Sequence, residues 1–357
     1  MRSPFSFVLF VTVILVSSTL ASTTLSVNNS GFVTGPLSGK WFDYVVIIMM
    51  ENHDINYTYG VSNPSWNSGS TNTCLGNCTY YDLLADSNGL AKEYVQDRNQ
   101  ITGCSLGCYI AITSGYGNTP QLCNAGPFAS GCQLLSQTNI VDRLESAHLS
   151  WKAYMEDYPI PFGCSNSFTG SYEPNHNPFI YYANIQNNVT RCSHIRNANS
   201  QILPQNSTGC WPTDVQNDDL LLNDLNSPST APNYTFLTPN RIDDNHDCND
   251  VSVGNAWLNK MVPQILGSTL FKTKRAALFI TFDEPDCTNS NTPTSCPPLR
   301  KELYSVWASN WVTKTGFRSV SSYTHYSPLR TIEDNWRLPY LNATTDGAAN
   351  NMQEFFH

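Results

Sequence analysis

The sequence contains few charged residues and, after its first residues, no long apolar run. Only 13% of the 357 residues are Asp, Glu, Lys or Arg, and 19 basic against 28 acidic residues give a formal net charge of −9. A nucleic-acid-binding surface needs clustered Lys and Arg, so the composition argues against nucleic acid as a partner. No apolar stretch beyond the N-terminal segment is long enough to cross a bilayer, which predicts no transmembrane segment in the mature protein.

Zinc-type cysteine motifs are also absent from the sequence. The cysteine spacings at 74/78 and 104/108 are CxxxC rather than CxxC. We therefore interpret the twelve cysteines as structural residues that form disulfides in an oxidising compartment. Two close pairs are placed to staple loops, namely Cys123 with Cys132 and Cys287 with Cys296.

No Pro/Ser-rich linker and no internal repeat divides the chain. This absence predicts a single α/β domain over residues 22–357. Apolar residues at helical spacing predict two core helices, over 139–148 and 255–266. Loops rich in Asn, Ser, Gly and Cys are expected at 60–79, 103–132 and 286–298.

The N-terminal segment is the exception to the lack of long apolar runs. A basic start, the short apolar core VLFVTVILV and the small residues SSTLA are typical of a secretory signal peptide, 1–21, cut after Ala21. Seven N-x-S/T sequons fit a secreted, extracellular glycoprotein. Their asparagines are Asn28, Asn56, Asn77, Asn188, Asn206, Asn233 and Asn342.

Two apolar runs, far apart in the sequence, each end in acidic and amide side chains. They occur within FDYVVIIMMENHD, residues 42–54, and AALFITFDEPD, residues 276–286. Apolar runs rich in β-branched residues are typical of strands buried on both faces of a parallel sheet, where functional groups gather beyond the carboxyl ends. If the two strands are neighbours, four side chains converge there: Glu51, Asn52, Asp283 and Glu284.

A cation is expected among these four side chains. Carboxylates held close together repel and raise one another's pKa unless a positive charge lies between them. Oxygen ligands favour a hard divalent ion such as magnesium, calcium or manganese, although zinc also accepts carboxylates. Either acidic pair alone fits a helix cap or a solvated turn better. Because the same layout occurs twice, we favour a divalent metal site.

A candidate nucleophile lies between the two runs, in ITGCSLGCYIAITSG, residues 101–115. This stretch predicts a tight loop that opens into a helix near Ser105. A serine at a helix start is usually an N-cap, and spacing alone favours that role. The same position also offers an anion site, and next to a divalent ion the hydroxyl can become a nucleophile.

A wider set of segments carries a family resemblance. In order, they are FDYVVIIMMENHD, SLGCYIAITSG, HLSWKAYMEDYP, PNHNPFIYY, PNYTFLTPNRIDDNHDC, WLNKMVPQIL, ALFITFDEPD and YTHYSPLRTIEDNW. Together, over about residues 41–340, they resemble the phosphoesterase family of secreted acid phosphatases and phospholipases C, within the alkaline phosphatase superfamily. The resemblance implies a three-layer α/β/α fold around a mostly parallel sheet.

The resemblance also implies roles for individual residues. Glu51 and Asn52 match the family's first pair of metal ligands, the 283–284 pair matches the second, and Ser105 matches the nucleophile. The family usually has Pro-Asn two residues after the nucleophile, whereas this chain has Gly107-Cys108. Two compensations are open: Asn118 or a backbone amide takes the place of the missing Asn, or Cys108 is tied to Cys104.

Three histidines lie in matching motifs. His246, beside Asp244 in DDNHDC, is the strongest candidate for binding phosphate or protonating the leaving group. His325 in YTHYSPL is a second catalytic candidate, while His176 in NHNPF and Asp244 are candidate substrate ligands. A lone histidine is more often a structural residue, and we give that interpretation to the remaining four: His53, His148, His194 and His357.

The expected function is metal-assisted hydrolysis of a small-molecule phosphate ester through a phosphoseryl intermediate. A secreted acid phosphatase acting on monoesters is the first choice, since no appended lipid-binding domain is evident. A phosphodiesterase or phospholipase C is the enzymatic alternative. The third hypothesis is a catalytically weakened, secreted binding glycoprotein, because the fold alone does not guarantee phosphoesterase chemistry.

Overall fold

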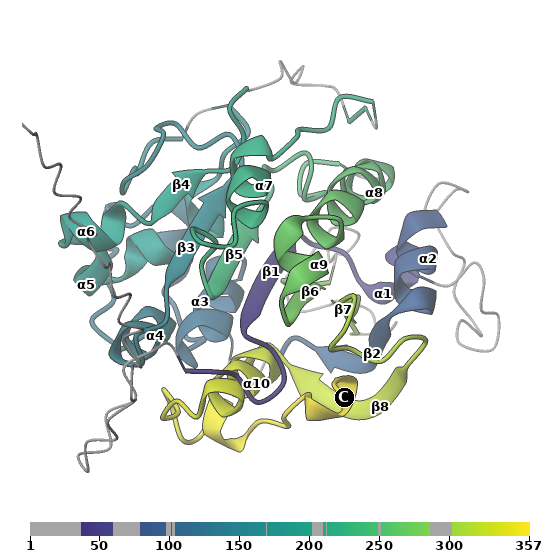
Figure 1. Cartoon of the computed structure of the whole chain (residues 1–357). Helices are drawn as coiled ribbons and strands as arrows, with labels where there is room; N and C mark the ends of the chain where they lie inside the picture. Colours follow the sequence, from purple (N-terminus) through teal and green to yellow (C-terminus); the bar gives the residue numbers. More distant parts are fainter. Residues whose placement is uncertain are drawn as a thin grey trace, which may run out of the picture. The chain divides into compact units, whose positions relative to one another are not determined.

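An eight-stranded sheet forms the centre of the described part of the chain (Figure 1). The computed structural model describes residues 37–59, 79–97, 101, 104–168, 170–201, 210–211, 213–248, 251–285 and 302–357. All of them belong to the unit Gly35–His357. In spatial order the strands are β4 (Ile195–Asn197), β3 (Trp151–Met155), β5 (Tyr234–Thr238), β1 (Tyr44–Met50), β6 (Ala276–Phe282), β7 (Ser305–Ala308), β2 (Gly89–Val95) and β8 (Arg318–Thr324).

The sheet is mostly parallel, as predicted. Of the eight described strands, β7 alone runs antiparallel to its neighbours, β6 and β2. The two apolar runs of the sequence are β1 and β6, which pair in parallel along their whole length, from Tyr44 opposite Ala276 to Met50 opposite Phe282. This pairing confirms that the strands are neighbours, and it makes their carboxyl ends adjacent.

Helices cover both faces of the sheet, which gives the expected three layers (Figure 1). On one face α9 packs against β6, and α2, α7 and α8 join it; on the other α3 packs against α10. The bounds of these helices are α2 (Thr79–Ser87), α7 (Asp219–Leu225), α8 (Ser252–Leu266), α9 (Thr269–Thr273), α3 (Leu106–Ser114) and α10 (Tyr326–Trp336). The other helices are α1 (Ile55–Thr58), α4 (Ile140–Ser146), α5 (Ala183–Gln186), α6 (Val189–Cys192), η1 (Gln121–Ala125), η2 (Pro174–His176), η3 (Pro178–Tyr181), η4 (Asp346–Ala348) and η5 (Gln353–Phe355).

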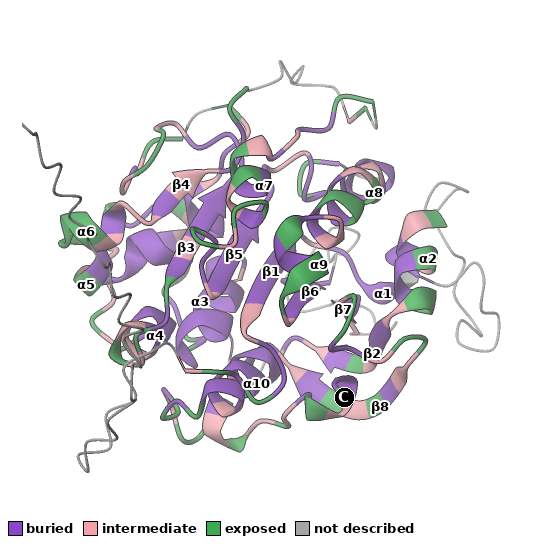
Figure 2. Ribbon diagram, viewed as in Figure 1, coloured by how far each residue is buried: buried purple, intermediate pink, exposed green. Residues whose placement is uncertain are grey.

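Both helices predicted from apolar spacing are confirmed, as α4 and α8. Asn139 caps α4 through a reciprocal capping box with Asp142. The predicted apolar positions of both helices are buried: Ile140, Val141, Leu144, Trp257, Leu258, Met261, Val262 and Ile265. Figure 2 shows the central strands buried and the outer faces of the helices exposed, as expected for helices that cover a sheet.

Four disulfides lie within the described residues: Cys104–Cys108, Cys123–Cys132, Cys164–Cys192 and Cys210–Cys248. The Cys123–Cys132 pair was predicted, and the Cys104–Cys108 bond was one of the two compensations considered for the altered nucleophile loop. The expected signal peptide, the Cys287–Cys296 pair and nearly all of loops 60–79 and 286–298 lie outside the described residues. None of the described helices is long and apolar enough to span a membrane.

Candidate active site

The ends of β1 and β6 bring together three of the four predicted metal ligands. Glu51 and Asp283 are completely buried. The backbone amide of Asn52 donates to Asp283 Oδ1 at 2.9 Å. Asn52 has a φ of 54°, a left-handed conformation that asparagine tolerates better than most residues. The sharp turn after β1 thus places Glu51, Asn52 and Asp283 at one point.

Burial makes these carboxyl groups weaker acids than carboxyl groups in water. Burial, reinforced by the charges of Asp283 and Asp244, raises the pKa of Glu51 well above its usual range. Burial also raises the pKa of Asp283. Two ionised carboxylates this close repel each other, so the pair retains a proton or needs a cation between its members.

Ser105 points at this acidic group rather than at the backbone of its own helix. It occupies the N-cap position of α3, yet its side chain makes no capping hydrogen bond. Its Oγ instead donates to Glu51 Oε2 at 2.9 Å. One turn later, the hydroxyl of Tyr109 donates to Glu51 Oε1 at 2.5 Å. The capping role favoured by spacing alone is therefore wrong for this side chain.

Asp244 and His176 form the second side of the site. Asp244 is buried, its carbonyl accepts from the Glu51 amide at 2.9 Å, and its Oδ1 accepts from the His246 amide at 2.7 Å. His176 stacks on Tyr109, with ring centroids 5.5 Å apart. Its Nε2 lies 3.4 Å from Glu51 Oε1 and its Nδ1 lies 3.2 Å from Asp244 Oδ2. Burial, together with the positive charges of His246 and Arg241, lowers the pKa of His176, so its ring is neutral.

His246 forms the accessible end of the site. Its ring centroid lies 5.4 Å from that of His176, and its side chain is 33% exposed. Its Nδ1 pairs with Asp247 Oδ1 at 2.8 Å. Burial alone would lower the pKa of His246, but the hydrogen bond to Asp247 and the charges of Asp244 and Asp283 outweigh it and raise the pKa. The raised pKa favours the protonated form of His246 at the accessible end of an acidic site.

Several buried polar atoms of the site have no hydrogen-bond partner among the described residues. They are Asn52 Oδ1, Asp244 Oδ2, Asp283 Oδ2 and both ring nitrogens of His176. Each such atom costs about 1–3 kcal/mol when it stays unpaired. Ligand atoms of Glu51, His176 and His246 also lie within 4.8 Å of one another. These residues fit a divalent cation, and the histidines add nitrogen donors to the expected oxygen ligands.

His325 does not share the open side of the site. It is fully buried, with Nδ1 2.8 Å from the Tyr94 hydroxyl and Nε2 2.5 Å from the carbonyl oxygen of Asp283. Because a carbonyl only accepts, Nε2 carries the proton and Nδ1 accepts from Tyr94. Burial lowers the pKa of His325 to about 4. With both nitrogens engaged by the protein, His325 is placed to position Asp283.

Two further predicted residues are placed differently from the core of the site. The backbone amide of Glu284 donates to the Asp283 carboxylate, and its side chain is half-buried. Glu284, like Asp283, lies outside the group of Glu51, His176 and His246 whose ligand atoms are within 4.8 Å of one another. Asn118 lines a surface hollow of about 520 Å³ with Tyr326 and Asn342, and neither Ser105 nor a predicted metal ligand lines it.

Sequence reasoning missed two tyrosines, Tyr94 and Tyr109. Tyr109 holds Glu51 and stacks on His176, whereas Tyr94 fixes the ring of His325. Tyr109 lies four residues after Ser105, on the same face of the helix. This spacing was a signal that both hydroxyls contact the same group, Glu51. Tyr94 lies in β2, a strand that no predicted site motif includes, and it gave no comparable signal.

The chain is similar in sequence to known proteins. The sequence model of the Phosphoesterase family matches residues 76–339. A probable acid phosphatase of Kluyveromyces lactis is 27% identical over 60% of this chain and 45% of its own length. An acid phosphatase of Aspergillus fumigatus is 27% identical over 77% of this chain and 56% of its own length. The chain thus spans about half the length of these relatives.

The fold has a counterpart among solved structures. A protein in the alkaline phosphatase superfamily from Vibrio parahaemolyticus superposes with a TM-score of 0.54 and 10% identity, over 84% of this chain and 68% of that protein. This likeness supports the predicted alkaline-phosphatase-like fold. Given the family match over most of its length, the chain belongs to the Phosphoesterase family.

Proposed function

We propose that this protein hydrolyses phosphate monoesters, with Ser105 as the nucleophile beside a divalent cation. The observation that carries the proposal is the direction of the Ser105 hydroxyl, which donates to the buried Glu51 carboxylate instead of capping α3. A serine directed at a carboxylate within a cation-competent group is arranged for nucleophilic attack. The names of the fungal relatives, acid phosphatases, favour monoesters as the substrate class.

The residues that would hold the cation are those with buried, unpaired ligand atoms. They are Asn52, Asp244, Asp283 and His176, together with Glu51. A bound divalent ion would lower the pKa of the serine hydroxyl and neutralise charge on a phosphoryl oxygen. Tyr109 orients Glu51, and Tyr94 with His325 fixes the backbone at Asp283.

Backbone amides can take the place of the asparagine that the family usually has after the nucleophile. The first amide of α3 bonded within the helix is that of Cys108, which donates to the carbonyl of Ser105. The amides of Leu106 and Gly107 precede it at the helix start, where donors point out of the helix. They would bind phosphoryl oxygens, and the Cys104–Cys108 disulfide holds this turn in place.

His246 would act on the leaving group. In the first step the Ser105 hydroxyl would pass its proton to Glu51 Oε2, which accepts its hydrogen bond. The bond from Ser105 Oγ to phosphorus forms, and the bond from phosphorus to the alcohol oxygen breaks. The imidazolium of His246 donates a proton to that oxygen, since its raised pKa favours the protonated form in weakly acidic solution. Water then hydrolyses the phosphoserine and releases phosphate.

We further propose that the protein is exported, because its disulfides persist in an oxidising compartment.

The proposal is tested with an aryl phosphate monoester and the matching diester, each with and without a chelator. We expect phosphate release from the monoester that the chelator abolishes and a divalent ion restores. Ser105→Ala should lower turnover by at least about 1,000-fold, while metal content is retained. Acid-quenched wild-type enzyme should yield a phosphorylated peptide that contains Ser105.

Ser114→Ala is the matched control, because Ser114 lies on the same helix but its Oγ donates to the carbonyl of Ile110 and accepts from the amide of Tyr116 rather than contacting Glu51. It should keep wild-type turnover. Unchanged turnover in Ser105→Ala would remove Ser105 from the mechanism. Preference for the diester would move the assignment to a phosphodiesterase, and bound metal without release from either ester would favour a binding protein.

A further inference from the structure

The three sequons whose asparagine side chains are described differ in what their amide groups contact. We propose that Asn188 carries an N-linked glycan in the folded, exported protein, and that Asn233 and Asn342 do not. The inference is independent of the proposed phosphatase activity. It depends on one chemical requirement: the sugar is attached to Nδ2, so this nitrogen must face open space after folding.

The transfer reaction defines that requirement. In the secretory pathway a polyprenyl-diphosphate-linked oligosaccharide serves as the donor. A bond forms between Asn Nδ2 and C1 of the first sugar, the bond from C1 to the diphosphate oxygen breaks, and the amide nitrogen loses one proton. Because transfer precedes or accompanies folding, the folded structure decides which glycosylated chains can reach the native state.

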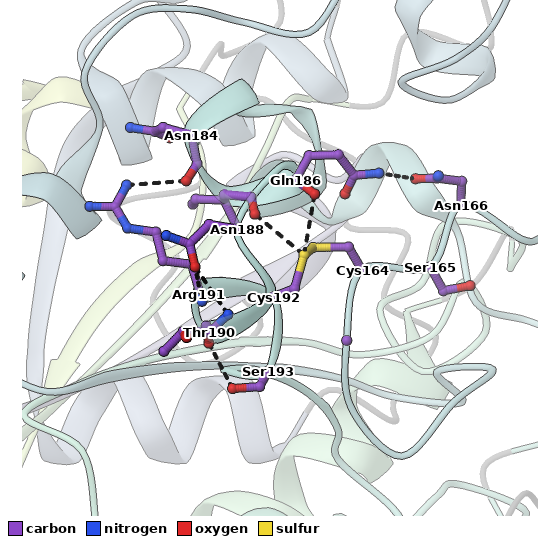
Figure 3. Close-up of a disulfide and its surroundings, with 12 residues drawn as sticks. Cys164, Ser165, Asn166, Asn184, Gln186, Asn188, Thr190, Arg191, Cys192 and Ser193 are labelled. Atoms are coloured by element: carbon purple, nitrogen blue, oxygen red, sulfur yellow. Dashed lines mark hydrogen bonds between the residues drawn. A yellow bond between two sulfur atoms is a disulfide. The ribbon is translucent and has the colours of Figure 1, made fainter.

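Asn188 meets the requirement. It is exposed and caps α6, with Oδ1 accepting from the amides of Thr190 at 3.0 Å and Arg191 at 3.1 Å (Figure 3). Capping uses only the oxygen, and none of the described residues accepts a hydrogen bond from Nδ2. A glycan on Asn188 therefore leaves the cap intact.

The surroundings of Asn188 also leave room for a sugar. The next residue, Val189, is 86% exposed. A hollow of about 530 Å³ is lined by both sequence neighbours of Asn188 and by Phe162, whose side chain is 57% exposed. The Cys164–Cys192 disulfide holds α6 against this hollow (Figure 3). The first sugar ring thus has open space beside it and apolar surface to cover.

Asn233 does not meet the requirement. Its Oδ1 accepts from both the amide and the hydroxyl of Ser150, each at 3.0 Å, and its Nδ2 donates to the carbonyl of Asp43 at 3.1 Å. These bonds tie the starts of β3 and β1 to β5. The sequon threonine, Thr235, is completely buried within β5. A glycan here would have to pull the side chain out of contacts that join three strands.

Asn342 is engaged at both ends as well. Its Nδ2 donates to the carbonyl of Gly115 at 3.3 Å, while its Oδ1 accepts from the amide and hydroxyl of Thr344 at 3.1 and 2.8 Å. Its own amide donates to Asp346. The side chain is half-buried and closes the turn after α3, so a sugar would disturb both segments.

The test uses the full chain secreted from a eukaryotic host. Enzymatic removal of glycans in heavy-oxygen water converts each glycosylated Asn into a labelled Asp that peptide mass spectrometry detects. We expect the label at Asn188 and unlabelled Asn at 233 and 342. An unlabelled Asn188, or a label at either of the other two positions, would overturn the assignment.

Two variants separate the glycan from the helix cap. Asn188→Asp keeps a capping oxygen and removes the acceptor nitrogen, whereas Thr190→Val removes the sequon hydroxyl and keeps the amide that the cap binds. Each should lose one glycan by mass and keep the thermal unfolding midpoint of enzymatically deglycosylated wild type. Asn187→Asp, outside the sequon, is the matched control and should retain the glycan. Unchanged mass in both sequon variants would contradict the proposal.

Discussion

Two groups of buried carboxyl side chains lie near the carboxyl ends of the central strands, and only one of them is suited to catalysis. The open acidic cluster consists of Glu51, Asp244 and Asp283 and continues through His176 to the partly exposed His246. The closed acidic cluster consists of Glu156, Asp157, Asp218 and Asp243, none of which is more than 1% exposed. Both clusters contain carboxyl groups whose pKa is raised by burial.

The closed cluster is held by amide and indole donors. Glu156 accepts from Trp257 Nε1 at 2.8 Å and from the Asn240 amide at 2.9 Å. Asp157 accepts from the side-chain amides of Asn199 and Asn240. Asp218 accepts no conventional hydrogen bond but faces Glu156, a contact that a shared proton satisfies. These groups fix Asn240, at the start of the turn that carries Asp244 and His246.

The difference shows that a buried acidic group does not by itself make an active site. Among the described residues, the contacts of the closed cluster include no imidazole and its four carboxyl groups are buried, so it serves to hold a turn. The open cluster adds a serine hydroxyl, two histidines and an exposed edge. The serine hydroxyl and the partly exposed His246, rather than carboxylates alone, distinguish the open cluster.

The largest expected effect comes from neutralising one carboxylate in each cluster. Asp283→Asn keeps an oxygen to accept from the Asn52 amide but removes a charge from the cation site. We expect kcat/KM to fall by at least about 100-fold, the upper range seen when partners of metal ligands are removed. Steady-state kinetics with metal analysis measures this loss.

Asp218→Asn is the matched change in the closed cluster. Its kcat/KM should stay within about threefold of wild type, because it removes no group that reaches the cation or substrate. Equal losses of kcat/KM in Asp283→Asn and Asp218→Asn would contradict the distinction between the clusters, since the closed cluster would then take part in the chemistry.

The next effect concerns stability and pH. Burial raises the pKa of Asp157 to about 6 and that of Asp218 to about 7. Because both folded-state pKa values exceed the unfolded value near 4, protonation stabilises the fold: this contribution is complete below about pH 4 and is lost as the pH rises through 6 and 7. Unfolding free energy should therefore decrease over that interval, by roughly a few kcal/mol.

Asp218→Asn sharpens this prediction because its side chain stays neutral at every pH. Its unfolding free energy, measured with denaturant between pH 4 and 8, should decrease less than that of wild type. If the unfolding free energy of Asp218→Asn changed with pH as steeply as that of wild type, Asp218 would ionise in the folded protein without a cost in stability. That result would contradict its burial in the closed cluster.

Much of the fold and part of the site were predictable because their signals are local. The apolar runs ending at Met50 and Phe282 predicted neighbouring buried strands, and the polar residues after them predicted the convergence of Glu51, Asn52 and Asp283. The helices α4 and α8 followed from apolar spacing in the same way.

The missed features depend on contacts between distant parts of the chain. Glu156 and Asp157 also follow a mostly buried strand, β3, so their local pattern resembles that of the predicted metal-ligand pairs. Only the folded structure shows that Trp257, 101 residues away, encloses Glu156. His325 lies in the expected motif, but Tyr94 and the Asp283 carbonyl occupy both of its nitrogens.

The smallest of the three effects tests whether a group that only positions the open cluster matters for turnover. Tyr94→Phe removes the hydroxyl that donates to His325 Nδ1 and leaves this nitrogen buried and unpaired, at a cost of about 1–3 kcal/mol in stability. The ring then holds the Asp283 carbonyl less firmly. We expect kcat to fall by about tenfold, the lower range for outer partners of metal sites, with little change in KM.

Tyr323→Phe separates this positioning effect from general destabilisation. Tyr323 is also buried and its hydroxyl donates to Glu354, but this contact joins β8 to the C-terminal segment and involves no residue of the open cluster. The control should lose stability and keep its kcat. If both variants lose stability and neither loses turnover, His325 supports the fold without tuning the site. A tenfold loss of kcat confined to Tyr94→Phe would instead add Tyr94 and His325 to the open cluster as buried positioning residues. The closed cluster would then be the buried network on which turnover does not depend.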